Sequence, residues 1–388
     1  MNTLKVKLIA FPGASKEIIS RGEQILRNKL TDFSIEITNQ NPDTLFIITG
    51  GSENQAKNLL KDKKQILILA ITENNSYAAA SEIKAYCNQK RIDSVLYNID
   101  NEKDLQTKLN HYLKCTKALS KLNNYKIGLI GEVSEWLIAS DIDKKILNNK
   151  FGLQLEKIAW NSFPKYSEYP VNTAFLNHFK NSGFNLEDSS KVFNLLQDII
   201  KQKQVDAITV ECFPLVRENA VTACLALSKL NTEGFASGCE GDITSITGKL
   251  IAKELTGQVP WMANLASLEE NKIFFAHCTI ATNLVSDYKI NTHFETGEGT
   301  AVQGKFKAEN ATVFRLNNAL SKAFISYGQI VERPEREDSC RTQIKIEIPK
   351  ADIQKLKENP LGNHHLIIPG DHVKLLKYFC KLTGIEVI

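Results

Sequence analysis

Residues 234–265 read GFASGCEGDITSITGKLIAKELTGQVPWMANL, and this stretch predicts a strand end, a tight glycine turn and a helix that ends near Gly257. The helix is expected over Ile243–Leu255, where apolar residues recur at steps of three and four positions, the spacing of a helix with one buried face. Glu240 and Asp242 stand in the turn directly ahead of it. A helix N-terminus favours negative charge, and sites are commonly built on turns at strand ends. We therefore expect a functional site at this turn, although Asp242 could also serve simply as the helix N-cap.

A third carboxylate and three imidazoles end or follow other short runs. Glu211 follows VDAITV at 205–210, His277 ends FFAH, and His364 and His365 stand together in GNHH. Carboxylates and imidazoles on loops beside a parallel sheet are the ligands of a hard or borderline divalent metal ion. In an extended segment one of the two adjacent histidines points inward and the other to solvent, so only one of them is expected to be a ligand.

Composition is that of an ordinary globular protein, with 43% hydrophobic and 24% charged residues. At 388 residues the chain is expected to form two or three domains. The absence of a long apolar run and of a secretory signal predicts a cytoplasmic protein without a membrane partner. The net charge of +4 comes from scattered lysines, which argues against a nucleic-acid partner.

The eight cysteines are scattered and predict neither a disulfide framework nor a zinc knuckle. Cys212 and Cys239 flank the candidate acids, but neither has an adjacent base, and a buried apolar role is expected for both. The pair Gly50-Gly51 lacks the spacing of a phosphate-binding loop, so no nucleotide is assigned to it.

Alternating strands and helices predict parallel sheets in the first two thirds of the chain. Strand, loop and helix repeat through residues 1–122, and a second cycle opens at 126–131 and continues to about residue 262. After that point, short strand-like runs separated by turns indicate an antiparallel barrel or sandwich. We therefore predict two doubly wound, flavodoxin-like or Rossmann-like α/β domains, 1–122 and 123–262, and a β-rich barrel-like domain, 263–388. A site for a polar small molecule is expected between domains.

Several short motifs follow one another in a characteristic order: Val133–Ser140, the Cys239–Asp242 turn with its helix, Ala276–Cys278, His293–Gly297, Gln303-Gly304, Phe314–Leu316 and Gly362–His365. Together they resemble the L-fucose/L-arabinose isomerase superfamily. The N-terminal part of the chain matches only in its αβ character, and the Glu-x-Asp turn with the following helix is the most specific piece.

The resemblance implies an enzyme that interconverts aldoses and ketoses through a cis-enediol. It also implies Mn²⁺, or another divalent ion such as Co²⁺ or Fe²⁺, held by a glutamate, an aspartate and a C-terminal histidine. These three match Glu211, Asp242 and either His364 or His365. Members commonly form trimers or hexamers, so a homo-oligomer is implied as well.

Moving a proton between adjacent carbons of a hydroxy-carbonyl compound requires a base, an acid and an electrophile that stabilises the enediolate. We hypothesise that Glu211 and Asp242 bind the metal and also exchange the proton, with His364 as the third ligand. The sugar-binding residues are then expected to be Trp136, Glu240, His277 and His365.

Glu211, together with Arg315 and His293 from the motifs quoted above, also has a structural interpretation. Glu211 could pair with Arg217, Arg315 could be a buried ion-pair partner, and His293 could be a hydrogen-bonded barrel residue. The alternatives in function are a sugar-binding protein without activity, and a metal-dependent epimerase or lyase that shares the enediolate. Because the chain is shorter than a typical fucose isomerase, the sugar itself is left open.

Overall fold

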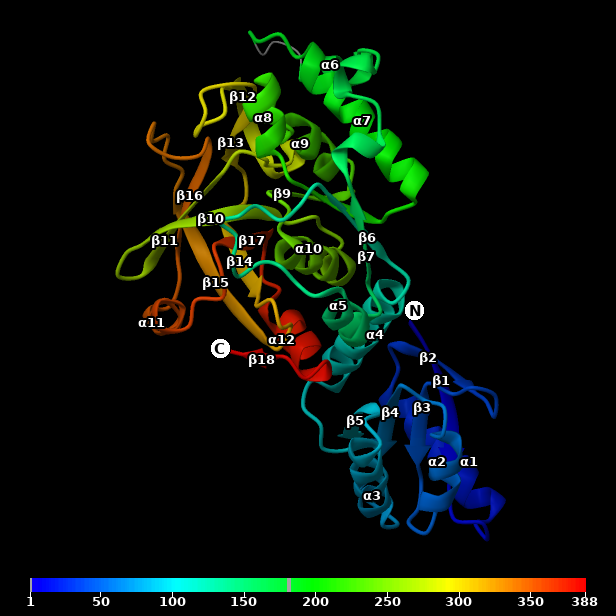
Figure 1. The fold of residues 1–388 in the computed structure, drawn as a ribbon. Coiled ribbons are helices and arrows are strands. Elements are labelled where there is room, and N and C mark those ends of the chain that lie inside the picture. Colours follow the sequence, from blue (N-terminus) through cyan, green and yellow to red (C-terminus); the bar gives the residue numbers. More distant parts are fainter. Residues whose placement is uncertain (1, 180–182) are drawn as a thin grey trace. The chain divides into compact units, whose positions relative to one another are not determined.

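The structure, a computed structural model, describes residues 2–179 and 183–388. The chain divides into two compact units, Met1–Thr116 and Lys117–Ile388 (Figure 1). The predicted boundary at residue 122 lies at the C-terminal end of helix α4 (Leu105–Leu122), whereas the division by contacts falls within that helix. The second unit contains both the second parallel sheet and the antiparallel barrel.

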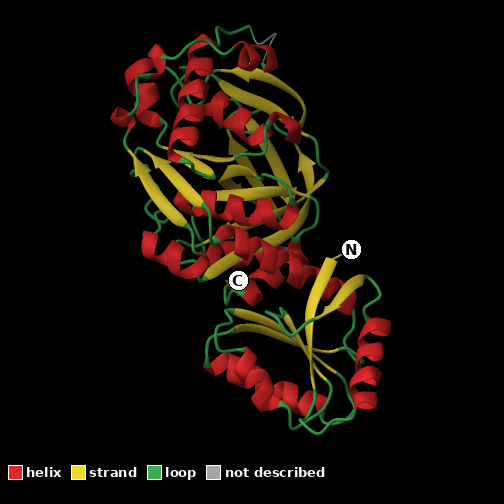
Figure 2. Cartoon of the chain, turned by 90° about the vertical axis from the view of Figure 1, so that its right-hand side faces the viewer, coloured by secondary structure: helices red, strands yellow, loops and turns green. Residues whose placement is uncertain are grey.

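The first unit is a five-stranded parallel sheet with the strand order β2-β1-β3-β4-β5. Its strands are β1 (Asn2–Ile9), β2 (Phe33–Ile37), β3 (Thr44–Ile47), β4 (Gln65–Ala70) and β5 (Asp93–Asn98). The helices α1 (Lys16–Lys29), α2 (Glu53–Leu59) and α3 (Ser76–Gln89) alternate with the strands. Figure 2 shows helices on both faces of this sheet, the doubly wound arrangement expected from the sequence.

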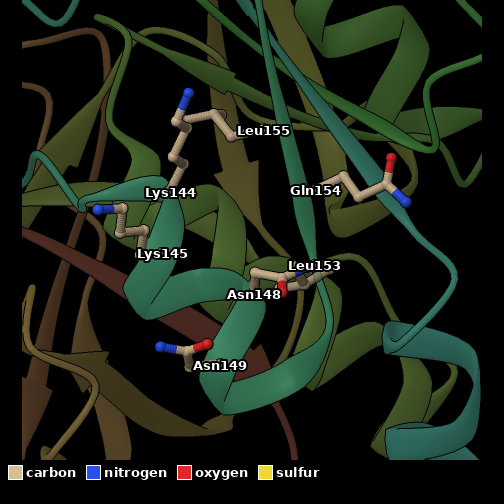
Figure 3. Close-up of a pocket in the computed structure, with 7 residues that line it drawn as sticks. All are labelled: Lys144, Lys145, Asn148, Asn149, Leu153, Gln154 and Leu155. Carbon is tan, nitrogen blue, oxygen red and sulfur yellow. The ribbon is translucent and has the colours of Figure 1, made fainter.

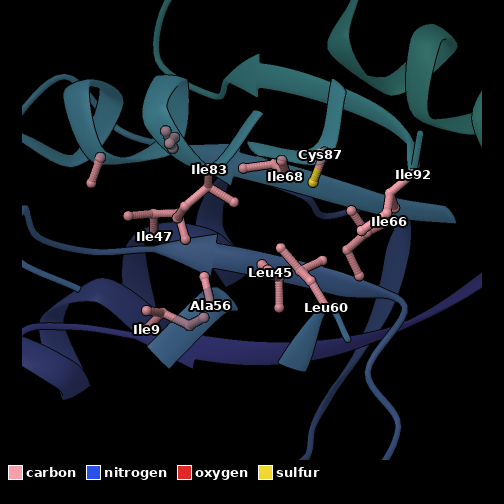
Figure 4. Close-up of a cluster of buried hydrophobic side chains, with 13 residues drawn as sticks. Ile9, Leu45, Ile47, Ala56, Leu60, Ile66, Ile68, Ile83, Cys87 and Ile92 are labelled. Carbon is pink, nitrogen blue, oxygen red and sulfur yellow. The ribbon is translucent and has the colours of Figure 1, made fainter. Parts of the chain in front are cut away.

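The core of the first unit forms between its central strands and α2 and α3. Ile66 and Ile68 of β4 pack in one cluster with Leu45 and Ile47 of β3 and with Ile83 of α3 (Figure 4). These side chains are buried, and burying each one stabilises the fold by about 1.5–3 kcal/mol. The near-continuous apolar runs of β3 and β4 are typical of strands covered on both faces.

The second unit begins with a four-stranded parallel sheet in the order β7-β6-β8-β9. The strands are β6 (Lys126–Ile130), β7 (Gln154–Ile158), β8 (Ala207–Val210) and β9 (Ala236–Cys239), and the longer helices between and after them are α5 (Lys144–Phe151), α7 (Glu187–Lys203), α9 (Cys224–Thr232) and α10 (Ile243–Thr256). Short helices α6 (Thr173–His178) and α8 (Phe213–Asn219) lie in the connections. Because the strands are parallel, the loops after β6, β8 and β9 meet at one edge of the sheet.

The rest of the second unit is an antiparallel barrel. Six strands follow one another in the order β14-β17-β10-β11-β16-β15, and the pairing of β14 with β15 closes the ring. They are β10 (Trp261–Leu268), β11 (Lys272–His277), β14 (Asn310–Leu316), β15 (Lys322–Glu332), β16 (Thr342–Glu347) and β17 (His364–Pro369). A ribbon of β12 (Val285–Asn291) and β13 (Ala301–Phe306) and the short strand β18 (Glu386–Val387) complete the strands, and the helices are α11 (Lys350–Glu358) and α12 (Val373–Leu382). The predicted fold class is confirmed.

Helix α10 joins the two sheets of the second unit, because it contacts β8 and β9 on one side and β14 and β17 on the other. Almost every residue of this helix is buried, so the expectation of a helix with a single buried face is wrong. The turn that precedes the helix contains Glu240 and Asp242. The helix therefore places this turn between the parallel sheet and the barrel. In the described part of the chain no helix combines the length and apolar composition needed to cross a membrane.

Candidate active site

The conformation of the turn between β9 and α10 determines the direction of the Glu240 side chain. Glu240 and Gly241 both adopt left-handed backbone conformations, with φ values of 62° and 68°. A Cβ atom on Gly241 would lie 2.3 Å from the carbonyl oxygen of Glu132, so this position requires glycine. Glu240 is not a glycine, and a left-handed backbone conformation in a non-glycine residue is typical of functional sites. The Glu240 side chain is nearly buried, with 7% of its residue surface exposed.

Two histidines from the barrel face the Glu240 carboxylate. Its Oε1 atom lies 3.5 Å from Nε2 of His364 and 3.9 Å from Nε2 of His277. The two imidazole rings are 5.4 Å apart and nearly perpendicular. His277 ends β11 and His364 begins β17, the two strands that flank β10. The structure thus brings together three of the residues predicted for the site.

Hydrogen bonds orient both imidazoles. Nδ1 of His364 lies 2.9 Å from Oδ2 of Asp242, and Nδ1 of His277 lies 2.8 Å from Oγ1 of Thr279. An ionised carboxylate only accepts hydrogen bonds, so Nδ1 of His364 carries a proton and donates a hydrogen bond to Asp242. Nε2 of His364 is buried and has no hydrogen-bond partner within residues 2–179 and 183–388. It points toward the Glu240 side of the site.

Asp242 is the N-cap of α10, the structural role that the sequence left open. Its Oδ1 accepts a hydrogen bond from the backbone N–H of Ser245 at 2.6 Å, and its Oδ2 accepts one from the Ser245 hydroxyl at 2.8 Å. Oδ2 also lies 3.3 Å from Nη1 of Arg315. Burial opposes the charge of Asp242, but Arg315 and His364 outweigh it and hold the pKa of Asp242 well below its ordinary value. The structure confirms Arg315 as a buried ion-pair partner.

The two carboxylates of the site stabilise the charged form of His364. Burial lowers the pKa of His364, but the carboxylates of Glu240 and Asp242 outweigh it and raise that pKa to about 9. Burial likewise raises the pKa of Glu240, and His364 and His277 outweigh it, so that this pKa lies well below its ordinary value. Positive charge at this point is therefore strongly stabilised.

An aromatic surface borders the Glu240 carboxylate. The indole Nε1 of Trp136 donates a hydrogen bond of 2.5 Å to Oε2 of Glu240, while 46% of the Trp136 surface stays exposed. Its ring meets the edge of Phe213 at 4.7 Å between centroids, and Phe213 meets His293 at 5.7 Å. We call Trp136 and Phe213 the aromatic wall. Of these residues, the sequence indicated Trp136 and His293 but missed Phe213, whose only signal is its place two residues after Glu211.

Glu211 lies at the carboxyl end of β8, on the loop next to that of Glu240. Its Oε2 atom accepts a hydrogen bond of 2.8 Å from the backbone N–H of Glu132, and a Cβ atom on Gly131 would lie 2.4 Å from the same oxygen. In the part of the chain that the structure describes, Glu211 makes no ion pair with Arg217. The cysteines that follow Glu211 and precede Glu240 lie with their sulfur atoms 3.1 Å apart; all eight cysteines are buried, and none forms a disulfide within the described residues.

His365 lies on the other side of β17 from His364. Its ring packs against Phe275 and Phe324, with centroids 5.7 and 6.2 Å apart, and its Nδ1 bonds to the carbonyl oxygen of Asn363. Burial and the nearby Arg315 lower its pKa to about 3, so the imidazole is neutral. The expectation that one of the two adjacent histidines faces solvent is wrong, because the barrel interior covers one face of β17 and α10 covers the other.

The donor atoms around Glu240 fit a divalent metal ion. Two ligand atoms that each lie about 2.1 Å from one ion are roughly 3.0–3.5 Å apart, close to the separations of Glu240 Oε1 from the two Nε2 atoms. Cys239, Glu240 and His277 form a buried group whose ligand atoms all lie within 4.8 Å of one another; His364, although its Nε2 lies 3.5 Å from Glu240, is not part of that group. Carboxylate and imidazole suit Mn²⁺, Fe²⁺ and Co²⁺. Asp242 behind His364 completes the carboxylate–histidine arrangement common behind metal ligands.

A separate pocket of about 390 Å³ lies at α5 and β7 (Figure 3). It is lined mainly by lysine and asparagine side chains of α5 and by residues at the start of β7, namely Lys144, Lys145, Asn148, Asn149, Leu153, Gln154 and Leu155. None of the candidate site residues lines it. It therefore gives no support to the site described above.

Comparison with known proteins shows that this chain is similar to sugar isomerases. No family model matches the chain. The sulfoquinovose isomerase of Clostridium sp. (strain MSTE9) is 23% identical over 323 residues, which cover 76% of this chain and 71% of that protein. The sulfoquinovose isomerases of Priestia aryabhattai and Priestia megaterium (strain ATCC 12872 / QMB1551) are each 22% identical over 307 residues, or 74% of this chain and 69% of theirs. The resemblance to the L-fucose/L-arabinose isomerase superfamily stays a prediction.

Proposed function

We propose that this protein is an aldose–ketose isomerase that acts on sulfoquinovose, or a closely similar sulfonated hexose, through a cis-enediol. The observation that supports it most is the convergence of Glu240, His277 and His364 beside the exposed ring of Trp136. The similarity to proteins named sulfoquinovose isomerase supports the sugar and the reaction class.

We propose that Glu240, His277 and His364 hold a divalent ion such as Mn²⁺. When bound, such an ion supplies the electrophile that stabilises negative charge on the sugar oxygens O1 and O2. Asp242 then fixes the tautomer of His364 through its Nδ1 atom, and Thr279 orients the ring of His277 through the hydrogen bond at its Nδ1 atom. This ligand set shares only His364 with the set that the family resemblance implies.

Asp242 and Glu211 receive other roles in this proposal. Both oxygens of Asp242 already accept hydrogen bonds inside a buried ion pair, so direct binding of an ion would require Arg315 to move. Asp242 is therefore assigned to the positioning of His364. Glu211 keeps the role of general base, because only its Oε2 is hydrogen-bonded within the described residues, to a single backbone N–H.

The reaction then needs one proton to leave C2 of the aldose and one to be delivered to C1 of the enediol. Glu211 would accept the proton from C2, exchange it with solvent and deliver a proton to C1, while the hydroxyl proton on O2 passes to O1. Trp136 holds the Glu240 carboxylate by its indole N–H and offers its exposed ring face to the C–H groups of the sugar. The nearly buried donors would act with little interference from water, which strengthens their electrostatic effect.

Isotope exchange tests the proposal. The purified protein is incubated with Mn²⁺, Co²⁺ or Fe²⁺ and with sulfoquinovose in deuterated water, and the sugar is followed by proton NMR. We expect formation of the ketose with deuterium at C1, and deuterium at C2 of the recovered aldose. If no sugar in a panel of sulfonated and neutral aldoses takes up deuterium at either carbon, the proposed reaction is excluded.

The same experiment separates the alternatives. Exchange at C2 that produces a second aldose without a ketose would indicate an epimerase that shares the enediol. Sugar binding by a protein that takes up none of the three metal ions would indicate a binding protein without catalysis.

A further inference from the structure

The exposed, positively charged side chain of Arg217 lies next to the aromatic wall. Arg217 follows Phe213 by four residues in α8, so the two side chains share one face of the helix. The guanidinium carbon of Arg217 lies 6.0 Å from the centroid of the Phe213 ring. The described residues place no carboxylate within ion-pair distance of it, and Glu211, the partner considered from the sequence, bonds to the backbone of Glu132 instead.

A continuous series of contacts leads from the candidate site to this cation. Glu240 accepts the Trp136 indole N–H, Trp136 meets the edge of Phe213, and Phe213 lies beneath Arg217. An extended six-carbon chain spans roughly 6 Å. With C1 and C2 beside Glu240 and its ring along the aromatic wall, a hexose extends past Trp136 toward Phe213, and the anionic group on C6 together with the length of the arginine side chain would have to close the remaining gap to Arg217, whose guanidinium carbon lies 6.0 Å from the Phe213 centroid.

In the described part of the chain, neither of the acidic groups nearest to Arg217, in sequence or along the wall, forms an ion pair with it. Glu218 lines a different pocket, of about 220 Å³, together with Lys165. Glu295 lies 3.1 Å from Nε2 of His293 and pairs with it. Arg217 thus keeps its charge available for a ligand, and a planar guanidinium binds tetrahedral anions with two parallel charge-assisted hydrogen bonds.

We propose that Arg217 determines substrate specificity by binding the anionic group on C6 of the sugar. The inference deepens the proposed function and rests on it, because it takes the position of the reacting carbons from that proposal. A neutral sugar leaves the arginine with water as its only partner, whereas a sulfonate replaces that water with charged hydrogen bonds.

Equilibrium binding tests the assignment without requiring turnover. The dissociation constants of sulfoquinovose and of its neutral counterpart 6-deoxyglucose are measured by calorimetry for the wild-type protein, Arg217→Gln, Arg217→Lys and Arg336→Gln. The control residue Arg336 is also exposed and also lies over a phenylalanine, 5.1 Å from the Phe274 ring, but it stands in the loop between β15 and β16 and pairs with Asp338. We expect Arg217→Gln to weaken sulfoquinovose binding by tenfold or more and Arg217→Lys to weaken it less. Arg336→Gln should match the wild type.

The outcomes separate the two proposals. The wild-type protein could bind sulfoquinovose but form no ketose, while Arg217→Gln loses the preference for sulfoquinovose over 6-deoxyglucose. This result would support the role of Arg217 and reject the isomerase reaction. Equal affinity of the wild type for the two sugars, no binding of sulfoquinovose, or an unchanged affinity in Arg217→Gln would each overturn the assignment. A parallel loss in Arg336→Gln would also overturn it, because the effect would then come from surface charge in general.

Discussion

Glu240 and Asp242 are two positions apart in the sequence but have different chemical surroundings. The sequence correctly placed both at a strand end ahead of a helix. It offered the N-cap role of Asp242, which a local contact with Ser245 fulfils, but it could not show the buried ion pair with Arg315, which is distant in the chain. For the same reason the grouping of Glu240 with His277 and His364 became visible only in the folded chain.

Replacement of Asp242 tests its positioning role. In Asp242→Asn the amide cannot compensate the buried Arg315, so the free energy of unfolding should fall by about 3–5 kcal/mol. Because His364 also loses the acceptor for its Nδ1 proton, the affinity for Mn²⁺ should fall by about 10–100-fold and not disappear. Denaturant unfolding and metal titration measure the two effects. Complete loss of metal binding in a folded variant would instead assign Asp242 as a direct ligand.

Lys249 gives a pH dependence of stability. Its ammonium group is buried in α10, where it donates hydrogen bonds to Oδ1 of Asn231 and the carbonyl oxygen of Ser237 and meets no carboxylate among the described residues. Burial lowers its pKa to about 7 from 10.5. Between these two pH values the unfolded chain binds a proton that the folded chain does not, so the free energy of unfolding rises with pH.

The variant Lys249→Met removes this dependence. The difference in the free energy of unfolding between the wild type and Lys249→Met should change in favour of the wild type by about 4 kcal/mol between pH 7 and pH 10.5. Contributions from other titrating groups cancel in the difference. Urea unfolding at several pH values measures it, and parallel curves for the two proteins would show that Lys249 is charged throughout.

At the scale of elements, sequence patterns located most of the parallel sheets and both ends of α10. Helix α10 was predictable because its apolar residues recur with helical spacing and Gly257 stands at its C-terminus. Helix α11 was missed, because of its nine residues only Ile353 and Leu356 are buried. Strand β17 was missed as well, since its two histidines interrupt the apolar pattern by which strands are identified.

The turn before α10 can be tested by adding one methyl group. Gly241→Ala would place a Cβ atom against the Glu132 backbone at a positive φ, whereas Gly257→Ala has the same sign of φ and no atom within 4 Å of its Cβ. The conformational cost alone is about 1–2 kcal/mol in both variants. We therefore expect Gly241→Ala to be the less stable of the two and to lose metal affinity. Equal unfolding free energies would show that the turn relaxes without effect.

At the scale of the whole molecule, the two compact units have separate hydrophobic cores. Alternation of strands and helices was sufficient to predict the doubly wound sheets, and short strands without helices were sufficient to predict the barrel. The closure of the barrel by β14 and β15 depends on long-range pairing, which no local pattern specifies.

Damage to the first core should leave the candidate site intact. Ile68→Ala removes a fully buried side chain and should destabilise the first unit by about 2–5 kcal/mol. The control Ile19→Ala alters a side chain that is 38% exposed and should have a small effect. Mn²⁺ affinity should be unchanged in both variants under conditions where the second unit stays folded. A loss of affinity in Ile68→Ala would show that the units fold as one.

The proposed metal site is tested by the Mn²⁺ content of the wild type, Glu240→Gln and Glu211→Gln after metal loading and removal of free ion. We expect one bound ion in the wild type and in Glu211→Gln, and none in Glu240→Gln. Full metal content in Glu240→Gln, with loss in Glu211→Gln, would contradict the proposed site and favour the ligand set implied by the family resemblance.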